Sequence, residues 1–340
     1  MLEEILITAR HNPKVDPMLG IWTWEISVYL FLGGLTAGII IFVALMNLLE
    51  KNDSHSFSAN RLALWAPIVL SVGMTTLFLD LEHKLYVFRF YTTLEPTSPM
   101  SWGAWVLMII YPISLLQIFS TFRKGYPTLA DFFERIPAVS MILDLSERYV
   151  KIISWIAIPS AVALGIYTGV LLSAFNARPF WNTGLLGPLF LISGMSTAAA
   201  FIVLFAKEHA EKRLFTKFDL GLIAVEIVLI VLLLINLATG SEQQLKALEY
   251  LTQGGGYAVA FWGGFFLLGL LVPLLVEFID LVHGNRTLAI LGPVLVLLGG
   301  YMLRHITVNL GQETTWQEYG TQFSVEALER VNKYYGSGLN

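Results

Sequence analysis

The sequence predicts an all-α integral membrane protein with eight transmembrane helices, arranged as two four-helix bundles. Of its 340 residues, 56% are hydrophobic and 14% are charged, and the mean hydropathy of +0.67 is far above that of soluble domains of this size. Apolar runs of spanning length, about 20 residues, recur eight times. Residues 30–37 resemble residues 190–197, and each stretch lies in the first span of a group of four, although small residues recur in any membrane helix.

The predicted spans can be read off in chain order. The first extends back to Trp22 if Glu25 is included, and the sixth is interrupted only by Glu226. Ser98 and Pro99 predict the start of the third helix, since proline is tolerated at the first helical position. The eight runs are Ile26–Leu49, Leu62–Leu79, Met100–Phe122, Ile152–Asn176, Pro179–Ala206, Leu220–Gly240, Tyr250–Val276 and Thr287–Leu303.

These spans divide the chain into a first bundle over residues 1–178, a second bundle over 179–310 and a polar tail over 311–340. Within the first span, Gly34 and Gly38 form a GxxxG pattern that predicts close helix packing. Because the number of spans is even, both termini are expected on the same side of the membrane. Residues 1–20 hold no long apolar core, so we expect no cleavable signal peptide.

The basic residues predict the orientation. By the positive-inside rule, the loops after spans one, three, five and seven are cytoplasmic and both termini are periplasmic, in a multi-pass protein of the inner membrane. Arg304 is counted with the periplasmic charges. The twelve residues on the predicted cytoplasmic side are Lys51, Arg61, Arg123, Lys124, Arg135, Arg148, Lys151, Lys207, Lys212, Arg213, Lys217 and Arg286.

The chain has no cysteine and only six histidines, which limits its cofactors. Disulfides, cysteine-ligated iron–sulfur clusters and thiol catalysis are excluded in this chain. The histidines are expected in loops or at helix ends, so we expect no haem and no metal site. An electron-transfer role would need a bound organic carrier or the cofactors of a partner. The net charge of −4 is spread over loops and indicates no nucleic-acid partner.

Polar and aromatic residues of the first four spans converge on the periplasmic leaflet. Glu25 and Tyr29 are four residues apart and share a helix face with Trp22. The second span runs outward and exits at Asp80 and His83. The third starts on that side near Trp102, and the fourth carries Tyr167 about two turns below its outer end.

This combination suits a quinone, menaquinone or ubiquinone. A quinone is a flat apolar ring with two carbonyls that need hydrogen-bond donors, and its redox chemistry moves protons together with electrons. Tyr29 and Tyr167 can donate hydrogen bonds, whereas Glu25, Asp80 and His83 can exchange protons with water.

Purely structural roles for these residues stay open. Glu25 can snorkel to the interface, the tyrosines and Trp102 can belong to an aromatic belt, and the Asp80–His83 segment can be a solvated loop. At the level of function, the alternatives are a proton-translocating channel or transporter and a passive membrane anchor. The first of these would use the acidic and basic residues Glu25, Glu226, Glu277 and Arg304.

Four motifs in the first half of the chain resemble the NrfD/PsrC family of quinone-binding membrane subunits of polysulfide reductase and related respiratory complexes. They are "YLFLGGLTAG" (29–38), "LDLEHKLYVF" (79–88), "PTSPMSWGAW" (96–105) and "NARPFWN" (176–182), and "LRHITVNLGQ" (303–312) matches in the second half.

The resemblance implies two four-helix bundles and a quinone, often menaquinone, in the first. Tyr167 looks like the family's quinone-contacting tyrosine and Asp80 like its acid on the second helix, whereas Tyr29 stands where we would expect a histidine. The implied partners are a periplasmic four-cluster iron–sulfur protein and, beyond it, a molybdopterin or multihaem catalytic subunit. Neither the terminal substrate nor the direction of electron flow follows from the sequence.

Overall fold

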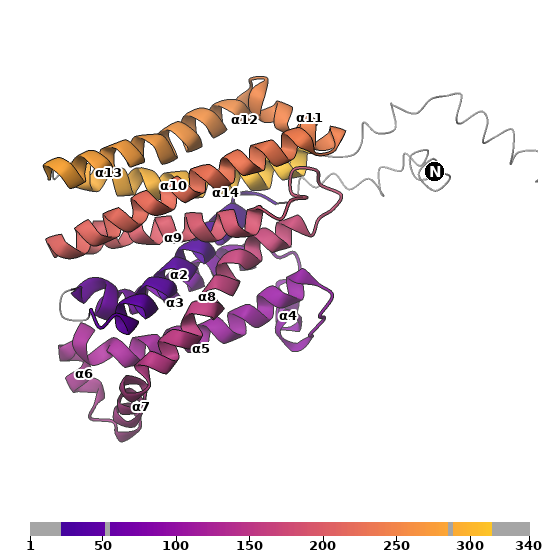
Figure 1. The fold of residues 1–340 in the computed structure, drawn as a ribbon. Helices are drawn as coiled ribbons and strands as arrows, with labels where there is room; N and C mark the ends of the chain where they lie inside the picture. Colours follow the sequence, from indigo (N-terminus) through magenta and orange to yellow (C-terminus); the bar gives the residue numbers. More distant parts are fainter. Residues whose placement is uncertain (1–21, 52–54, 285–287, 315–340) are drawn as a thin grey trace, which may run out of the picture.

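The computed structural model of the protein describes residues 22–51, 55–284 and 288–314, and within these residues it contains helices and no strand (Figure 1). Eight helices of the described part of the chain are long and apolar enough to cross a membrane, so the all-α multi-pass prediction is confirmed. These spans are α2 (Trp24–Leu48), Phe57–Asp80 (η1, η2 and α3), α5 (Pro99–Gly125), α8 (Val150–Ser173), α9 (Leu186–Phe205), α10 (His209–Thr239), Gly256–His283 (α12, η4 and α13) and α14 (Leu288–Glu313).

Four predicted helix starts are wrong by more than a turn: that of the second span, which begins at Phe57 rather than Leu62, and those of the fifth, sixth and seventh. The fifth span begins at Leu186 rather than Pro179, because Pro179 lies in a turn whose following side chains, Phe180 and Trp181, are buried in the protein. The sixth begins at His209 rather than Leu220. Its charged first turns stay helical because one acid, Glu211, is buried and accepts hydrogen bonds from the backbone and hydroxyl of Ser58, both at 2.6 Å.

The last two spans also differ from prediction. The seventh begins at Gly256, because the preceding residues fold into a separate short helix, α11 (Glu242–Thr252), with a Ser241–Gln244 capping box. The eighth continues past Leu303 to Glu313. Arg304 is therefore not a loop charge but a fully buried residue inside the membrane span. His305, expected at a helix end, lies inside α14.

Helix α2 is the central element, in contact with α3, α8, α9 and α14. The GxxxG prediction is confirmed: a Cβ on Gly38 would lie 2.5 Å from the Cβ of Ala198, and one on Gly194 would lie 2.6 Å from the carbonyl oxygen of Gly34. Gly34 and Gly194 are equivalent positions of the two similar segments, so the similarity lies at the junction of the two halves. The contacts are compatible with two four-helix bundles, and that division stays a prediction.

The spans end on two faces. We call the end that carries Trp22 and Thr314 the terminal face, and the other end the opposite face. The terminal face bears the 81–98 segment, with η3 (Lys84–Tyr86) and α4 (Arg89–Thr92), and α11. The opposite face bears α6 (Pro127–Phe133) and α7 (Pro137–Arg148), which lie beside the end of α5 (Figure 1). Residues 1–21 and the tail from 315 onward lie outside the described residues, and so do the aromatic tail positions that the sequence predicts at a partner interface, Trp316, Tyr319, Tyr334 and Tyr335.

Candidate functional site

A cavity of about 260 Å³ opens among the terminal-face ends of α2, α3, α5 and α8. We call it the site cavity. Part of its wall comes from the 81–98 segment, which closes over the helix ends. Most of its lining is apolar: Trp22, Ile26, Tyr29, Leu30, Met74, Leu77, Phe78, Asp80, Leu81, Val87, Phe90, Tyr91, Met100, Gly103, Ala104, Leu107, Tyr167, Leu171 and Leu172.

Three phenols, together with the carboxylate of Asp80, form the polar part of this lining. Tyr29 on α2 and Tyr167 on α8 are 6% and 8% exposed, and Tyr91 of α4 lies close enough to interact electrostatically with Tyr29. Neither Tyr29 nor Tyr167 makes a hydroxyl hydrogen bond to any described residue. Burial raises the pKa of Tyr91, so that phenol keeps its proton at neutral pH. The cavity therefore offers hydroxyl donors that the protein itself does not use.

Gly103 fixes the position of the Tyr167 ring. A Cβ on Gly103 would overlap the ring carbons and hydroxyl of Tyr167, so the ring lies directly on the α5 backbone. Gly103 lies near the start of α5, which begins four residues earlier at Pro99. The helix packs there against α4 of the 81–98 segment. A hydrogen bond connects the 81–98 segment to α5: the backbone N–H of Glu95 donates to the hydroxyl of Ser101 at 3.0 Å.

Two carboxylates lie at this end of the first four helices. Asp80, the last residue of α3, lines the cavity. Glu25, in the first turn of α2, does not line it, but its carboxylate accepts a hydrogen bond from Thr23 and acts electrostatically on Asp80. The two acids are thus adjacent, with Asp80 on the cavity side and Glu25 beside it.

Trp22 connects the cavity wall to the end of the last helix. Its ring packs against Trp181 (centroids 5.4 Å apart) and Phe175 (5.6 Å). Its backbone exchanges two hydrogen bonds with the Gln312 side chain, at 2.9 and 2.8 Å. The "NARPFWN" stretch is thereby anchored to α14, and Trp181 donates to the carbonyl of Thr307 at 2.7 Å.

Arg178 strengthens the same anchor by donating to the Gln312 carbonyl at 2.9 Å. Its side chain is buried, and burial lowers the pKa of this guanidinium from its ordinary value. The motif that joins the two halves of the chain therefore has a structural role next to the cavity.

The structure brings four of the predicted site residues into the cavity lining, namely Trp22, Tyr29, Asp80 and Tyr167. Glu25, His83 and Trp102 are not in the lining. His83 is exposed on the terminal face with its ring edge toward Tyr86. Trp102 points away, and its indole N–H donates to the carbonyl of Pro96 at 2.7 Å.

Sequence reasoning missed Tyr91 and Phe90. Both lie in the one-turn helix α4, which is too short to show helical periodicity in the sequence, and only the density of aromatic residues between 86 and 91 marks the segment. It also missed Gly103, whose importance depends on a tyrosine 64 positions away in the sequence, on another helix.

A second group of polar residues lies inside the other half of the membrane domain. We call it the buried-acid cluster: Asp219 and Glu226 on α10, Glu277 on α13 and Arg304 on α14, all at most 2% exposed. Arg304 donates to the hydroxyl of Ser193 at 2.6 Å and the carbonyl of Phe190 at 2.9 Å.

The acids of this cluster are linked in turn. The hydroxyl of Ser196 donates to Asp219 at 2.5 Å, Asp219 acts electrostatically on Glu277, and Arg304 on Glu226. Glu277 lies close enough to Asp219 for their carboxyl groups to interact directly, and no basic side chain of the described residues donates a hydrogen bond to Glu277. The cluster therefore contains more acids than the single guanidinium can compensate. Sequence reasoning found Glu226, Glu277 and Arg304 but missed Asp219.

Among the residues that the structure describes, no group of three or more His, Asp or Glu side chains is placed to hold a metal ion. The site cavity thus presents aromatic, aliphatic and hydroxyl groups with one carboxylate. This donor set suits a flat organic ligand that accepts hydrogen bonds.

The similarity to known proteins covers nearly the whole chain. Residues 10–315 match the family described as polysulphide reductase, NrfD. The chain is similar to a protein NrfD homolog of Haemophilus influenzae, with 28% identity covering 89% of this chain and 97% of that protein. It is also similar to one of the chains of polysulfide reductase from Wolinella succinogenes, with 27% identity over 86% and 94% of the two sequences.

A more distant relative is a subunit of selenate reductase from Mesobacillus selenatarsenatis, with 25% identity covering 89% of this chain and 77% of that protein. These matches span all eight membrane helices and both halves of the chain. The protein is therefore a multi-pass membrane protein that belongs to the polysulphide reductase NrfD family.

Proposed function

We propose that this chain is the quinone-reactive membrane subunit of a multi-subunit respiratory oxidoreductase, and that the site cavity binds the headgroup of menaquinone or ubiquinone. The observation that carries the proposal is the pair of buried phenols, Tyr29 and Tyr167, which line an otherwise apolar cavity with hydroxyls that no described residue accepts. Because both residues line the cavity, their hydroxyls are free to donate to the carbonyl oxygens of a bound ligand.

The size and chemistry of the cavity fit a ring headgroup. At about 260 Å³ it is slightly smaller than the range of about 300–1,000 Å³ typical of small-molecule sites. It can take a headgroup but not also a long isoprenoid tail, which would stay among lipid chains. Aromatic and aliphatic side chains from α2, α3, α5 and the 81–98 segment supply flat apolar walls.

A bound quinone supplies two-electron chemistry that takes up or releases two protons. In the proposal, Tyr29 and Tyr167 orient the headgroup by donating to its carbonyl oxygens. Asp80 exchanges protons at the cavity wall, and Glu25 passes them on toward the terminal face. Trp22 and the Trp181 anchor hold the wall in place and limit the access of water.

The partners in this proposal follow from the relatives. Two of them are named as one lettered component of a reductase, which indicates assembly with other chains. We propose a four-cluster iron–sulfur protein at the terminal face, with a molybdopterin or multihaem catalytic subunit beyond it. The basic loops of the opposite face would make that face cytoplasmic, so both termini and the partner would be in the periplasm.

An azidoquinone photoprobe applied to the purified complex would test the site. Label is expected in peptides from the terminal-face ends of α2, α3, α5 and α8, and excess quinone should compete. Ala104→Phe places a ring in the cavity and should abolish labelling. The matched control Ala224→Phe, at an exposed position of α10, should not. Equal labelling of wild type and Ala104→Phe would contradict the proposal. An absence of label in the wild-type chain would also contradict it and would indicate a passive membrane anchor.

A second candidate function, proton movement across the membrane by the same chain, is favoured by the buried-acid cluster. An uncompensated carboxylate in a membrane interior is costly and usually functional. Asp219, Glu226 and Glu277 lie on two helices of the second half and connect through Arg304 toward Gly34 on α2, where a Cβ would lie 3.0 Å from the guanidinium.

Reconstituted complex with a pH-sensitive dye inside the vesicles tests this second function. Glu277→Gln is expected to remove the transmembrane proton signal while quinone-linked turnover continues. Glu249→Gln, at an exposed position of α11, serves as the control. A proton signal that survives Glu277→Gln would remove the cluster from any transport role.

A further inference from the structure

The connection between α5 and α8 exposes a stripe of apolar side chains. The stripe consists of five exposed residues at helical spacing, four in helix α7 and one directly after it: Ala138, Met141, Ile142, Leu145 and Tyr149. Met141 is 67% and Leu145 56% exposed. A water-facing helix places such a stripe against the protein, and exposed apolar patches mark interaction surfaces.

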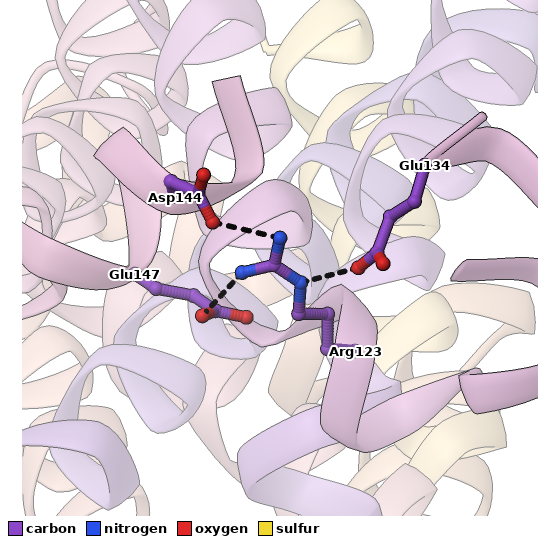
Figure 2. A network of polar contacts seen from close by, with 4 residues as sticks. All are labelled: Arg123, Glu134, Asp144 and Glu147. Atoms are coloured by element: carbon purple, nitrogen blue, oxygen red, sulfur yellow. Dashed lines mark hydrogen bonds and ion pairs between the residues drawn. The ribbon is translucent and has the colours of Figure 1, made fainter. Parts of the chain in front are cut away.

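The side of α7 that faces the protein is mixed, with the apolar side chain of Leu143 fully buried beside a set of ion pairs. Arg123, at the end of α5, forms ion pairs with Glu134 at 2.5 Å, Asp144 at 2.8 Å and Glu147 at 2.8 Å (Figure 2). Ser146 is buried on the same side. These contacts fix α7 to the end of α5 and set its apolar stripe outward, so the exposure is built into the packing.

The stripe continues without a gap into the surface of a membrane span. Tyr149 joins α7 to α8, and the next exposed apolar residues, Ile152, Trp155 and Ile156, belong to the membrane-spanning face of α8. Trp155 is 67% exposed, as expected for a side chain against lipid. Leu129 and Phe132 of the neighbouring α6 add to the same apolar surface.

Basic residues border the patch. The Arg135 guanidinium lies 5.9 Å from the centre of the Phe132 ring, and that of Arg148 lies 5.8 Å from the Tyr149 ring. Arginine next to an exposed aromatic ring is the pattern of the membrane–water boundary, where the ring sits at headgroup level and the cation reaches phosphates or water.

We propose that α6 and α7 lie in the membrane–water boundary at the opposite face, with the stripe from Ala138 to Tyr149 inserted among the acyl chains of that leaflet. The connection between α5 and α8 is then an interfacial anchor rather than a free loop or a protein-docking site. Its occupant is the lipid that already covers the face of α8, because the two apolar surfaces are continuous. Arg123 is the residue that keeps the stripe turned toward this lipid.

The absence of cysteine in the chain allows a direct test by site-directed spin labelling. Single variants Met141→Cys and Leu145→Cys are labelled in the full complex, reconstituted in phosphatidylcholine and phosphatidylglycerol vesicles. Collision rates with oxygen and with a water-soluble nickel chelate are then measured. Ile156→Cys is the lipid-facing reference, and Asp131→Cys, exposed on α6, is the water-facing one.

Both stripe positions should resemble Ile156, with frequent oxygen collisions and nickel collisions several-fold rarer than at Asp131. Nickel access equal to that of Asp131 would show a stripe in water and overturn the proposal. Low access to both reagents would show a covering protein instead, and spin–spin broadening would show a second copy; either result also overturns it.

Discussion

The phenol ring of Tyr167 lies directly against the Cα atom of Gly103, and no side chain larger than hydrogen fits between them. This contact joins α5 to α8 at the depth where the site cavity opens. It sets the direction of the Tyr167 hydroxyl without any hydrogen bond to the described protein, so the hydroxyl remains available to a ligand.

Gly103→Ala should therefore displace the Tyr167 ring. Glycine to alanine within a helix normally stabilises by roughly 0.5–1 kcal/mol, but overpacking costs about 1–3 kcal/mol. We expect a lower melting temperature and reduced quinone-linked turnover of the assembled complex. Gly221→Ala on α10, where a Cβ meets nothing within 4 Å, is the control and should keep both. Unchanged turnover in Gly103→Ala would mean that the position of Tyr167 is unimportant.

Removing the phenol hydroxyls tests their role as donors. Tyr29→Phe and Tyr167→Phe each delete one hydroxyl and keep the ring, which should cost about 0.5–1.5 kcal/mol, or up to about tenfold in quinone affinity. Assembly should survive. Tyr301→Phe is the matched control, because Tyr301 packs against Phe31 and His305 outside the cavity lining. Wild-type affinity in both cavity variants would place the quinone elsewhere.

The two carboxylates should contribute unequally. Asp80 lines the cavity and Glu25 does not, so Asp80→Asn should lower turnover by the larger factor, on the order of 10²-fold for a lost proton-exchange group. Glu25→Gln should lower it less, and Asp131→Asn on the opposite face should have no effect. The measurement is turnover with a soluble quinol at saturation. An effect of Glu25→Gln equal to or greater than that of Asp80→Asn would reverse the assigned order of proton transfer.

Arg304 and Glu226 should be coupled energetically. The two charges are buried and interact electrostatically without a direct ion pair between these described residues, and removing one of two opposite buried charges costs up to about 3–5 kcal/mol, because the other stays buried. Arg304→Met alone should thus lower the melting temperature sharply, and adding Glu226→Gln should recover part of the loss. A double variant as unstable as the sum of the two single variants would show that the two residues act independently.

Much of the site cavity could be predicted from the order and direction of the membrane spans. Alternating spans place the ends of α2, α3, α5 and α8 on one face, and Trp22, Tyr29, Asp80 and Tyr167 are near those ends in the sequence. Their shared location could therefore be predicted without side-chain detail. The cap over the cavity could not, since the 81–98 segment lacks periodicity and its fold depends on local bonds such as Ser101 to Glu95.

Charged residues near the ends of spans made the true helix boundaries hard to predict. Asp219 looks like the boundary of a hydrophobic run, and so does Arg304, yet helices α10 and α14 continue past both and bury them. Charge-free windows locate a span but shorten it wherever a buried charged residue lies near its end. Only tertiary contacts, here with Ser196 and Ser193 on α9, distinguish a buried charge from a loop charge.

The last prediction concerns the partner. The terminal face carries an exposed apolar patch outside the spans, formed by Leu85, Tyr86, Phe88 and Leu94, with Leu85 89% exposed. The patch lies on the segment that closes the site cavity, so a partner docked there would bring its cofactor close to the proposed quinone. Aromatic and large apolar residues are enriched at the centres of protein interfaces.

Leu85→Cys, in this otherwise cysteine-free chain, should crosslink to the iron–sulfur subunit in the assembled complex through a short bifunctional reagent. Lys124→Cys, exposed on the opposite face, should not. Tunnelling rates fall steeply with distance, so the electron carrier has to lie at the same face as the quinone. If the iron–sulfur subunit were crosslinked only through the opposite face, the cavity could not be its electron-exchange site, and the proposed orientation would be wrong as well.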